Sequence, residues 1–196
     1  MKYTYKYISI MLLLFSCQQK EPIIVEQIIS KEVVTILPNL KNPSIQDSVV
    51  ISIPLEFKVT MNSTVDYVVW LFRINNKTLW DDVIDYQVYK KQNKTEPIYQ
   101  LDSDKSLIDK PIDIIIRERN HLISKTDAKT LLRKYNRNKS LDNLKLGDTI
   151  KLVTYDKLRN ENKTLIEDFE KVKDSIHFKA IRGEKENFYI AKKINW

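Results

Sequence analysis

The sequence predicts a mainly β protein, either an antiparallel β-sandwich or a partly open barrel, with two peripheral helices. Residues 49–61 alternate between apolar and polar side chains, and residues 65–74 are apolar at both parities. Only two stretches, 124–135 and 164–174, place apolar residues at helical spacing. Because alternation with period two is typical of strands and a spacing of three to four residues is typical of helices, strands are expected to dominate.

The first half of the chain is expected to be built from strands. Residues 22–37 are rich in Ile and Val, which favour strands over linkers, with a turn near 30–32. Residues 49–61 form the clearest strand, and Pro54, which lacks an N–H, implies an edge position or a bulge there. The strand at 65–74 is expected to be central, because both of its faces are apolar. Shorter strand candidates follow at 84–88, 98–101 and 112–116.

After residue 117 the pattern changes to two helices and three further strands. The first helix is expected to follow Ser124, in a Ser-x-x-Asp sequence that has the form of a capping box, and to reach Tyr135. A second capping box at Thr164 predicts a helix over 164–174. The strands are expected at 150–155, 176–181 and 188–194, the last two as a hairpin.

The first seventeen residues predict where the protein resides. Lys2 and Lys6 precede an apolar run at 7–15, which suits a secretory signal but is shorter than the roughly 20 residues that span a bilayer. The run closes on Leu14-Phe15-Ser16-Cys17, which resembles the lipobox of bacterial lipoproteins. The resemblance implies that the signal peptide is cut before Cys17 and that this cysteine carries fatty acids such as palmitate.

A lipid on Cys17 implies the membrane as a partner and a location in the cell envelope. Gln18 stands where an inner-membrane retention signal has Asp, so the resemblance favours the outer membrane. The sequence Gln18-Gln19-Lys20-Glu21 partly resembles the export signal of surface lipoproteins in the Bacteroidota, and the choice between the periplasmic face and the surface stays open. Because Cys17 is the only cysteine, acylation would leave no thiol for a disulfide, a zinc site or a nucleophile.

The domain organisation follows from these features and from the chain length, which suits one domain. Residues 18–116 carry 11 basic and 14 acidic side chains, whereas residues 117–196 carry 20 and 12. This break favours an alternative fold, a β-sandwich to about residue 120 followed by a small α+β unit. The predicted divisions are a signal peptide at 1–16, a lipid-anchored and partly ordered segment at 17–44, and a mainly β domain at 45–196 with a sub-boundary near 117–123.

The basic side chains just after residue 116 form a candidate binding surface. Such a surface could meet lipid phosphate, lipopolysaccharide or an acidic protein. Nucleic acid is disfavoured as a partner, because a lipid anchor places the domain outside the cytoplasm. The residues of this candidate surface are Arg117, Arg119, Lys125, Lys129, Arg133, Lys134, Arg137 and Lys139.

A second candidate binding group combines aromatic and acidic side chains. Aromatic rings beside carboxylates can hold a sugar, and two carboxylates at the right separation can hydrolyse one. The group consists of Trp80, Asp81, Asp82, Asp85 and Tyr86. The two histidines are weaker candidates: His121 has positive sequence neighbours, which would lower its pKa and oppose metal binding, and His177 is expected to be exposed.

These patterns favour a non-enzymatic binding or interaction module anchored in the envelope, with a protein or glycan as its partner. No catalytic residue, metal site or cofactor is predicted, and a chain with two glycines excludes a glycine-rich phosphate loop. Two alternatives stay open. One is an envelope hydrolase that acts on glycan or cell-wall material through Asp81, Asp82 or Asp85. The other is a structural or assembly component of the envelope.

Overall fold

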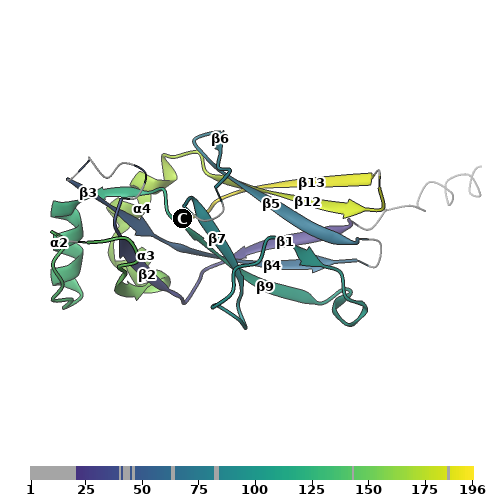
Figure 1. The fold of residues 1–196 in the computed structure, drawn as a ribbon, viewed down its shortest axis with the longest axis horizontal. Helices are drawn as coiled ribbons and strands as arrows, with labels where there is room; N and C mark the ends of the chain where they lie inside the picture. The colour runs from purple at the N-terminus through teal and green to yellow at the C-terminus, as the bar shows by residue number, and fades with distance from the viewer. Residues whose placement is uncertain are drawn as a thin grey trace, which may run out of the picture.

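The computed structural model describes residues 21–39, 41, 45, 47–62, 65–81, 84–142, 144–184 and 186–196, and within this part the fold is mainly β, as predicted. Its strands form three antiparallel sheets, which we label A, B and C, in an elongated molecule (Figure 1). The predicted signal peptide, Cys17 and Asp82 lie outside the described residues.

Sheets A and C form a sandwich. Phe57 from sheet A meets Phe178 from sheet C edge to face, with ring centroids 5.7 Å apart, and Phe72 meets Tyr86 across the same interface. Sheet A has the order β1 (Ile23–Ile28), β4 (Pro54–Met61), β9 (Pro111–Glu118) and β7 (Tyr86–Lys90). Sheet C has the order β13 (Glu186–Lys193), β12 (Ser175–Arg182), β5 (Tyr67–Ile74) and β6 (Lys77–Thr78), and β8 (Leu101–Asp102) also pairs with β5.

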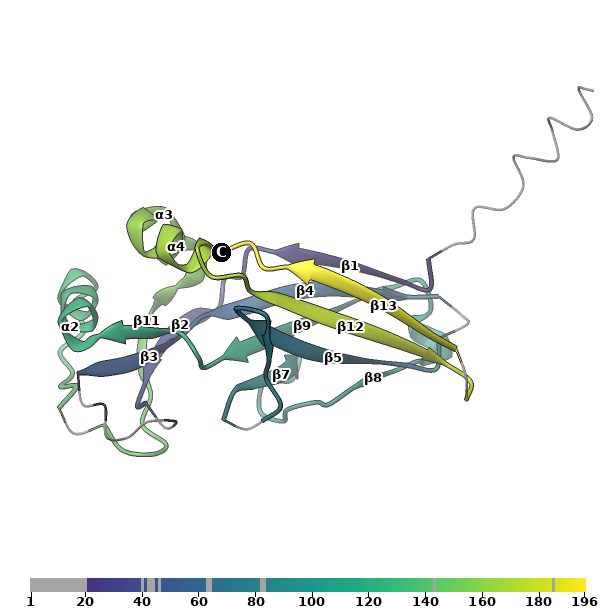
Figure 2. The ribbon, with the colours of Figure 1, turned by 90° about the horizontal axis from the view of Figure 1, so that it is seen from above.

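Sheet B lies at the end of the molecule opposite the start of β1 (Figure 2). Its order is β10 (Leu122–Ser124), β3 (Ser48–Ser52), β2 (Val33–Leu37) and β11 (Ile150–Thr154). The helices gather at this end, where α2 and α3 pack against the sheet. They are α2 (Lys125–Lys134), α3 (Tyr155–Glu161) and α4 (Lys163–Glu170), and a short 3₁₀ helix (Lys105–Leu107) lies elsewhere.

The chain crosses repeatedly between the sheets. The predicted strand at 49–61 is present, but it belongs to sheet B up to Ser52 and to sheet A from Pro54 onward. Pro54 is the first residue of β4, a position that tolerates a missing N–H. Because β10 and β11 flank β2 and β3, the residues after 117 do not form a separate unit, and the two-unit alternative is not the fold.

Several other elements match the sequence pattern, with differences at the helices. β5 is flanked by β12 on one side and by β6 and β8 on the other, and β12 forms the expected hairpin with β13. The Ser124 Oγ caps α2 by accepting a hydrogen bond from the Asp127 N–H, as predicted. The second predicted capping box is wrong, because α4 begins at Lys163 after Asn162. The third helix, α3, begins where the sequence pattern suggested the end of a strand.

Candidate functional site

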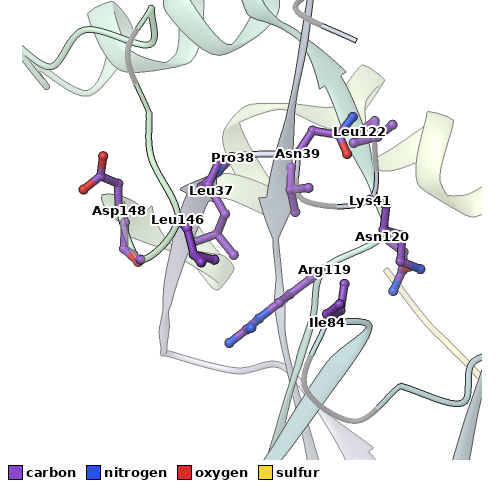
Figure 3. A pocket seen from close by; sticks show the side chains of 13 residues that line it. Leu37, Pro38, Asn39, Lys41, Ile84, Arg119, Asn120, Leu122, Leu146 and Asp148 are labelled. Carbon is purple, nitrogen blue, oxygen red and sulfur yellow. The ribbon is translucent and has the colours of Figure 1, made fainter. Parts of the chain in front are cut away.

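A cleft of about 260 Å³ lies on one face of sheet B. Its floor is a row of apolar side chains on three neighbouring strands: Leu122 of β10 faces Val50 of β3, and Val50 faces Leu37 of β2. Residues directly opposite one another in an antiparallel sheet point to the same face, so this row is continuous. Ile84 and Leu146 add further aliphatic side chains from two loops (Figure 3).

Three of these aliphatic side chains are exposed to solvent. Leu146 is 80% exposed, Leu122 45% and Ile84 38%. Single exposed hydrophobic residues are common on protein surfaces, whereas several around one hollow mark a binding surface. Leu146 is held outward by a tight turn, in which Asp148 Oδ2 accepts a hydrogen bond from the Lys145 N–H and Gly147 has φ of +93°. A side chain at residue 147 would strain this turn, because that backbone conformation favours glycine.

Polar groups border the same cleft. Arg119 extends from the Ile84 side toward Leu146 (Figure 3), and its guanidinium donates a hydrogen bond to Gln87 Oε1. Burial lowers the pKa of Arg119 below its ordinary value, although the group stays charged. Lys41 pairs with Asp85 and also donates a hydrogen bond to the Asn120 side chain. The cleft therefore combines an aliphatic floor with a cationic border, and Asp148 is its acidic lining residue.

Two carboxylates of the predicted aromatic and acidic group, those of Asp81 and Asp85, serve the turn that leads into β7. Asp81 Oδ1 accepts a hydrogen bond of 2.7 Å from the Ile84 N–H, and Asp85 Oδ2 accepts one of 3.2 Å from the Asp81 N–H. Asp85 is buried and paired with Lys41. These contacts place Ile84 and Lys41 at the cleft. Asp81 and Asp85 therefore support the shape of the cleft.

The aromatic members of that group line a second hollow, of about 200 Å³, on the sandwich. Trp80 is 79% exposed, whereas Tyr86 is buried between the sheets. Tyr99, which the sequence pattern did not single out, is 59% exposed and lines the same hollow. We call this the aromatic hollow; its other lining residues are Trp70, Leu71, Val88, Pro97 and Ile98.

The eight residues of the candidate basic surface lie in several places. The Arg117 guanidinium lies over the Tyr89 ring, 5.1 Å from its centroid, and Arg119 borders the cleft. Lys134 donates hydrogen bonds to the Glu161 carbonyl and to the Asn162 side chain at the α3–α4 junction. Lys125 begins α2. The remaining four line one hollow of about 460 Å³ at the end of α2: Lys129, Arg133, Arg137 and Lys139.

His121 forms a buried charged cluster that the sequence did not reveal. Its Nδ1 lies 2.9 Å from Glu118 Oε1 and its Nε2 lies 3.0 Å from Asp174 Oδ2. Burial lowers its pKa, but the charges and hydrogen bonds of the two carboxylates outweigh burial and raise the pKa from 6.5 to about 10. The expectation of a lowered pKa is therefore wrong, because the ring lies against Glu118, three residues before it, and against Asp174, 53 residues after it.

This cluster is built for stability. The His121 ring packs edge to face against Phe169 and Trp196, with centroids 4.8 and 4.7 Å away, and all three side chains are buried. A histidine that stays protonated at neutral pH, with both ring nitrogens against carboxylates, is poorly suited to proton transfer. His177 is half-buried, and its pKa is lowered by burial and by Arg73.

No protein-family model matches this chain, and no curated protein or solved structure shows significant similarity to it. In the part of the chain that the structure describes, no group of three or more His, Cys, Asp or Glu side chains is arranged to hold a metal ion. Within the same residues, no helix combines the length and the apolar character needed to cross a bilayer. The cleft is thus the candidate site that the contacts of this chain support best.

Proposed function

We propose that the protein is a lipid-anchored, non-enzymatic interaction module of the cell envelope, and that its cleft docks aliphatic side chains of a protein partner. The observation that carries this proposal is the continuous row of Leu122, Val50 and Leu37, with Leu146 beside it at 80% exposure. Burial of apolar surface yields about 25 cal/mol per Å², so exposed aliphatic side chains around one hollow favour association. A cleft of about 260 Å³ suits single side chains, since pockets for drug-sized ligands measure about 300–1,000 Å³.

The position of the cleft also supports an anchored module. Five residues separate Cys17 from Ile23, the first residue of β1. A chain of this length reaches at most about 20 Å, so a lipid on Cys17 would hold the start of β1 near the membrane. Sheet B and its cleft lie at the opposite end of the molecule (Figure 2). The cleft would therefore face away from the membrane, where a partner can reach it.

The contacts of the acidic group favour binding over hydrolysis. Glycosidases place two carboxylates on opposite sides of a scissile bond, about 5–9.5 Å apart. Here Asp81 and Asp85 are joined within one turn by a hydrogen bond, and Asp85 is buried beside Lys41. Both carboxylates are thus committed to shaping the loop next to the cleft.

A glycan partner is the second candidate, and the aromatic hollow favours it. Trp80 precedes β7 in the chain and Tyr99 follows it, and both expose large ring surfaces at this hollow. Exposed aromatic rings are suited to stacking against the apolar face of a sugar ring, whereas the aliphatic row of the cleft offers no such platform. The two candidates therefore use different surfaces, and one experiment can separate them.

Site-specific photocrosslinking in native cells tests the proposal. Benzoylphenylalanine is placed at Leu146, at Leu122 and, as a matched control on the outer face of sheet C, at Tyr189, which is 68% exposed. We expect the same dominant protein adduct from residues 146 and 122 and none from residue 189. Equal adducts at all three positions would contradict docking in the cleft. If no protein adduct forms and the purified protein binds a glycan array through Trp80, the glycan candidate replaces the present proposal.

A further inference from the structure

The cleft adjoins a basic hollow at the edge of sheet B. The basic hollow measures about 420 Å³ and is lined by residues 136–139 and 149–151, and Thr149 lines the cleft as well. Thr149 directly precedes β11, the edge strand of sheet B, so the two cavities meet where the sheet ends. A segment that lies in the cleft can therefore continue across Thr149 into the basic hollow.

Backbone contacts fix the cations of the basic hollow in place. The segment 136–139 leaves α2 and runs beside β11, where Arg137 Nε donates a hydrogen bond of 2.9 Å to the Leu152 carbonyl. The Arg137 N–H also donates to the Leu132 carbonyl, and the Lys139 N–H donates to the Arg137 carbonyl. Lys151, on β11, completes a set of three exposed cations around the hollow.

Positive charge is concentrated in this hollow and in the one beside it. The basic hollow shares residues 137–139 with the neighbouring hollow at the end of α2, which adds Lys129 and Arg133. Among the described residues, neither hollow is lined by an acidic side chain, although Lys129 pairs with Asp142 at 3.5 Å. The helix dipole favours cations in the last turn of α2, but its influence falls off beyond that turn and does not account for Lys139 and Lys151.

We propose that the segment docked in the cleft is acidic along the part that continues toward β11. This inference rests on the proposed function. An aliphatic side chain of the partner fills the cleft, and carboxylates of the same segment pair with Arg137, Lys139 and Lys151. Arginine binds a carboxylate through two parallel hydrogen bonds, and the charge of the two hollows steers an acidic chain toward the site.

The position of the basic hollow favours a protein over a membrane as the anionic partner. The hollow lies on sheet B, whereas β1 starts at the other end of the molecule (Figure 2). A membrane that holds the lipid on Cys17 would lie at the start of β1, so its phosphate groups would be far from Lys139 and Lys151. An acidic polypeptide has no such restriction.

Selection from a library of displayed random 12-residue peptides tests this inference, with the detergent-solubilised full chain as bait. We expect enriched peptides to combine an aliphatic residue with two or more acidic residues close by in sequence. Affinities of the enriched peptides are then measured by fluorescence anisotropy at two salt concentrations. The double variant Lys139→Gln/Lys151→Gln should weaken binding about fivefold to tenfold and flatten the salt dependence.

Matched variants make the outcomes distinct. Lys77→Gln/Lys110→Gln removes the same charge from two exposed lysines on other elements and should change the affinity less than twofold. Leu146→Ala, at an exposed turn that does not endanger folding, should weaken every enriched peptide. Peptides that need Leu146 but show no acidic bias would overturn the inference and leave the proposed function intact. Absence of any enriched peptide that depends on Leu146 would count against the proposed function itself. Binding to phosphatidylglycerol vesicles through Lys139 and Lys151, without peptide binding, would replace the acidic protein by a lipid.

Discussion

Trp196 Nε1 donates a hydrogen bond of 3.2 Å to Asp174 Oδ2, the same oxygen that lies 3.0 Å from His121 Nε2. The buried Asp174 carboxylate thus accepts a hydrogen bond from the neutral indole of Trp196 and pairs with the protonated ring of His121. These two partners lie 75 residues apart in the sequence. Phe169 closes the cluster, with its ring 5.6 Å from Trp196. The cluster joins the end of β9, the α4 helix and the residues after β13, so it ties sheet A to sheet C near sheet B.

Replacing His121 should strongly destabilise the protein. In His121→Gln, two buried carboxylates lose their shared cation, and breaking a buried ion pair on one side costs about 3–5 kcal/mol. Urea unfolding followed by circular dichroism would measure the loss. His177→Gln is the matched control, because His177 is half-buried and forms no ion pair with a carboxylate among the described residues. This substitution should lower the free energy of unfolding by less than about 1 kcal/mol. Equal losses for both variants would contradict the assigned role.

The stability of the protein should fall as the pH rises from about 6.5 to about 10. The pKa of His121 is about 10 in the folded protein and 6.5 as the ordinary value. Because folding raises the pKa of His121, the stabilisation that its protonated ring provides is fully present below pH 6.5. It is lost as the pH rises through 10. The free energy of unfolding of the wild type, relative to His121→Gln, should therefore drop by on the order of 4 kcal/mol across this window. Parallel pH profiles of the two proteins would show that His121 is neutral when folded.

Truncation of the Trp196 side chain should cost more than removal of its hydrogen bond. Trp196 is fully buried, and Trp196→Ala should lower the free energy of unfolding by about 3–5 kcal/mol. Trp196→Phe keeps most of the ring packing and leaves Asp174 one donor short, so its cost should be about 1–3 kcal/mol. Thermal unfolding of both variants would measure the difference. An equal cost for the two would mean that the hydrogen bond to Asp174, rather than ring packing, dominates.

Replacement of Cys17 should separate anchoring from folding. Cys17→Ser removes the sulfur that would carry the lipid, and the chain has no other cysteine whose disulfide could be lost. We expect loss of fatty-acid labelling and of processing before residue 17, with an unchanged far-UV circular dichroism spectrum. A Cys17→Ser protein that still takes up labelled palmitate would refute the resemblance to a lipobox.

The elements that the sequence predicted best are those whose signal is local. Residues 49–61 were recognised by their alternation, although the structure buries both faces up to Phe57 and places the two halves in different sheets. α2 was recognised because Ser124 and its apolar stripe lie within a dozen residues. α3 was missed because it follows β11 directly, and neither Thr154 nor Asn162 makes a side-chain cap at the starts of α3 and α4. Without caps, a short helix carries little local signal.

The candidate site depends on long-range register, which the sequence does not display. Leu37, Val50 and Leu122 come together only because β10, β3 and β2 pair in one register. Nothing in the sequence around Leu146 indicates that its side chain is exposed, and its exposure is visible only in the fold. For His121, the preceding segment holds two arginines and one acidic residue, Glu118, whereas the partners of its ring in space are Glu118 and the distant Asp174. Sequence neighbours therefore suggested the opposite direction for its pKa.

The step at Ile53, where one strand passes from sheet B into sheet A, has a mechanical consequence. Val50 in the cleft floor is joined to β4 through a few residues of extended backbone, while β1, which leads to Cys17, runs antiparallel to β4 through six residue pairs. A partner pulling on sheet B against a membrane anchor would load both the backbone that runs from β1 into β2 and the residue pairs that join β1 to β4. Because their hydrogen bonds lie perpendicular to the strands, they would share such a force in shear rather than open one after another. With a lipid on Cys17 and a partner in the cleft, as proposed, this geometry would resist traction between the two.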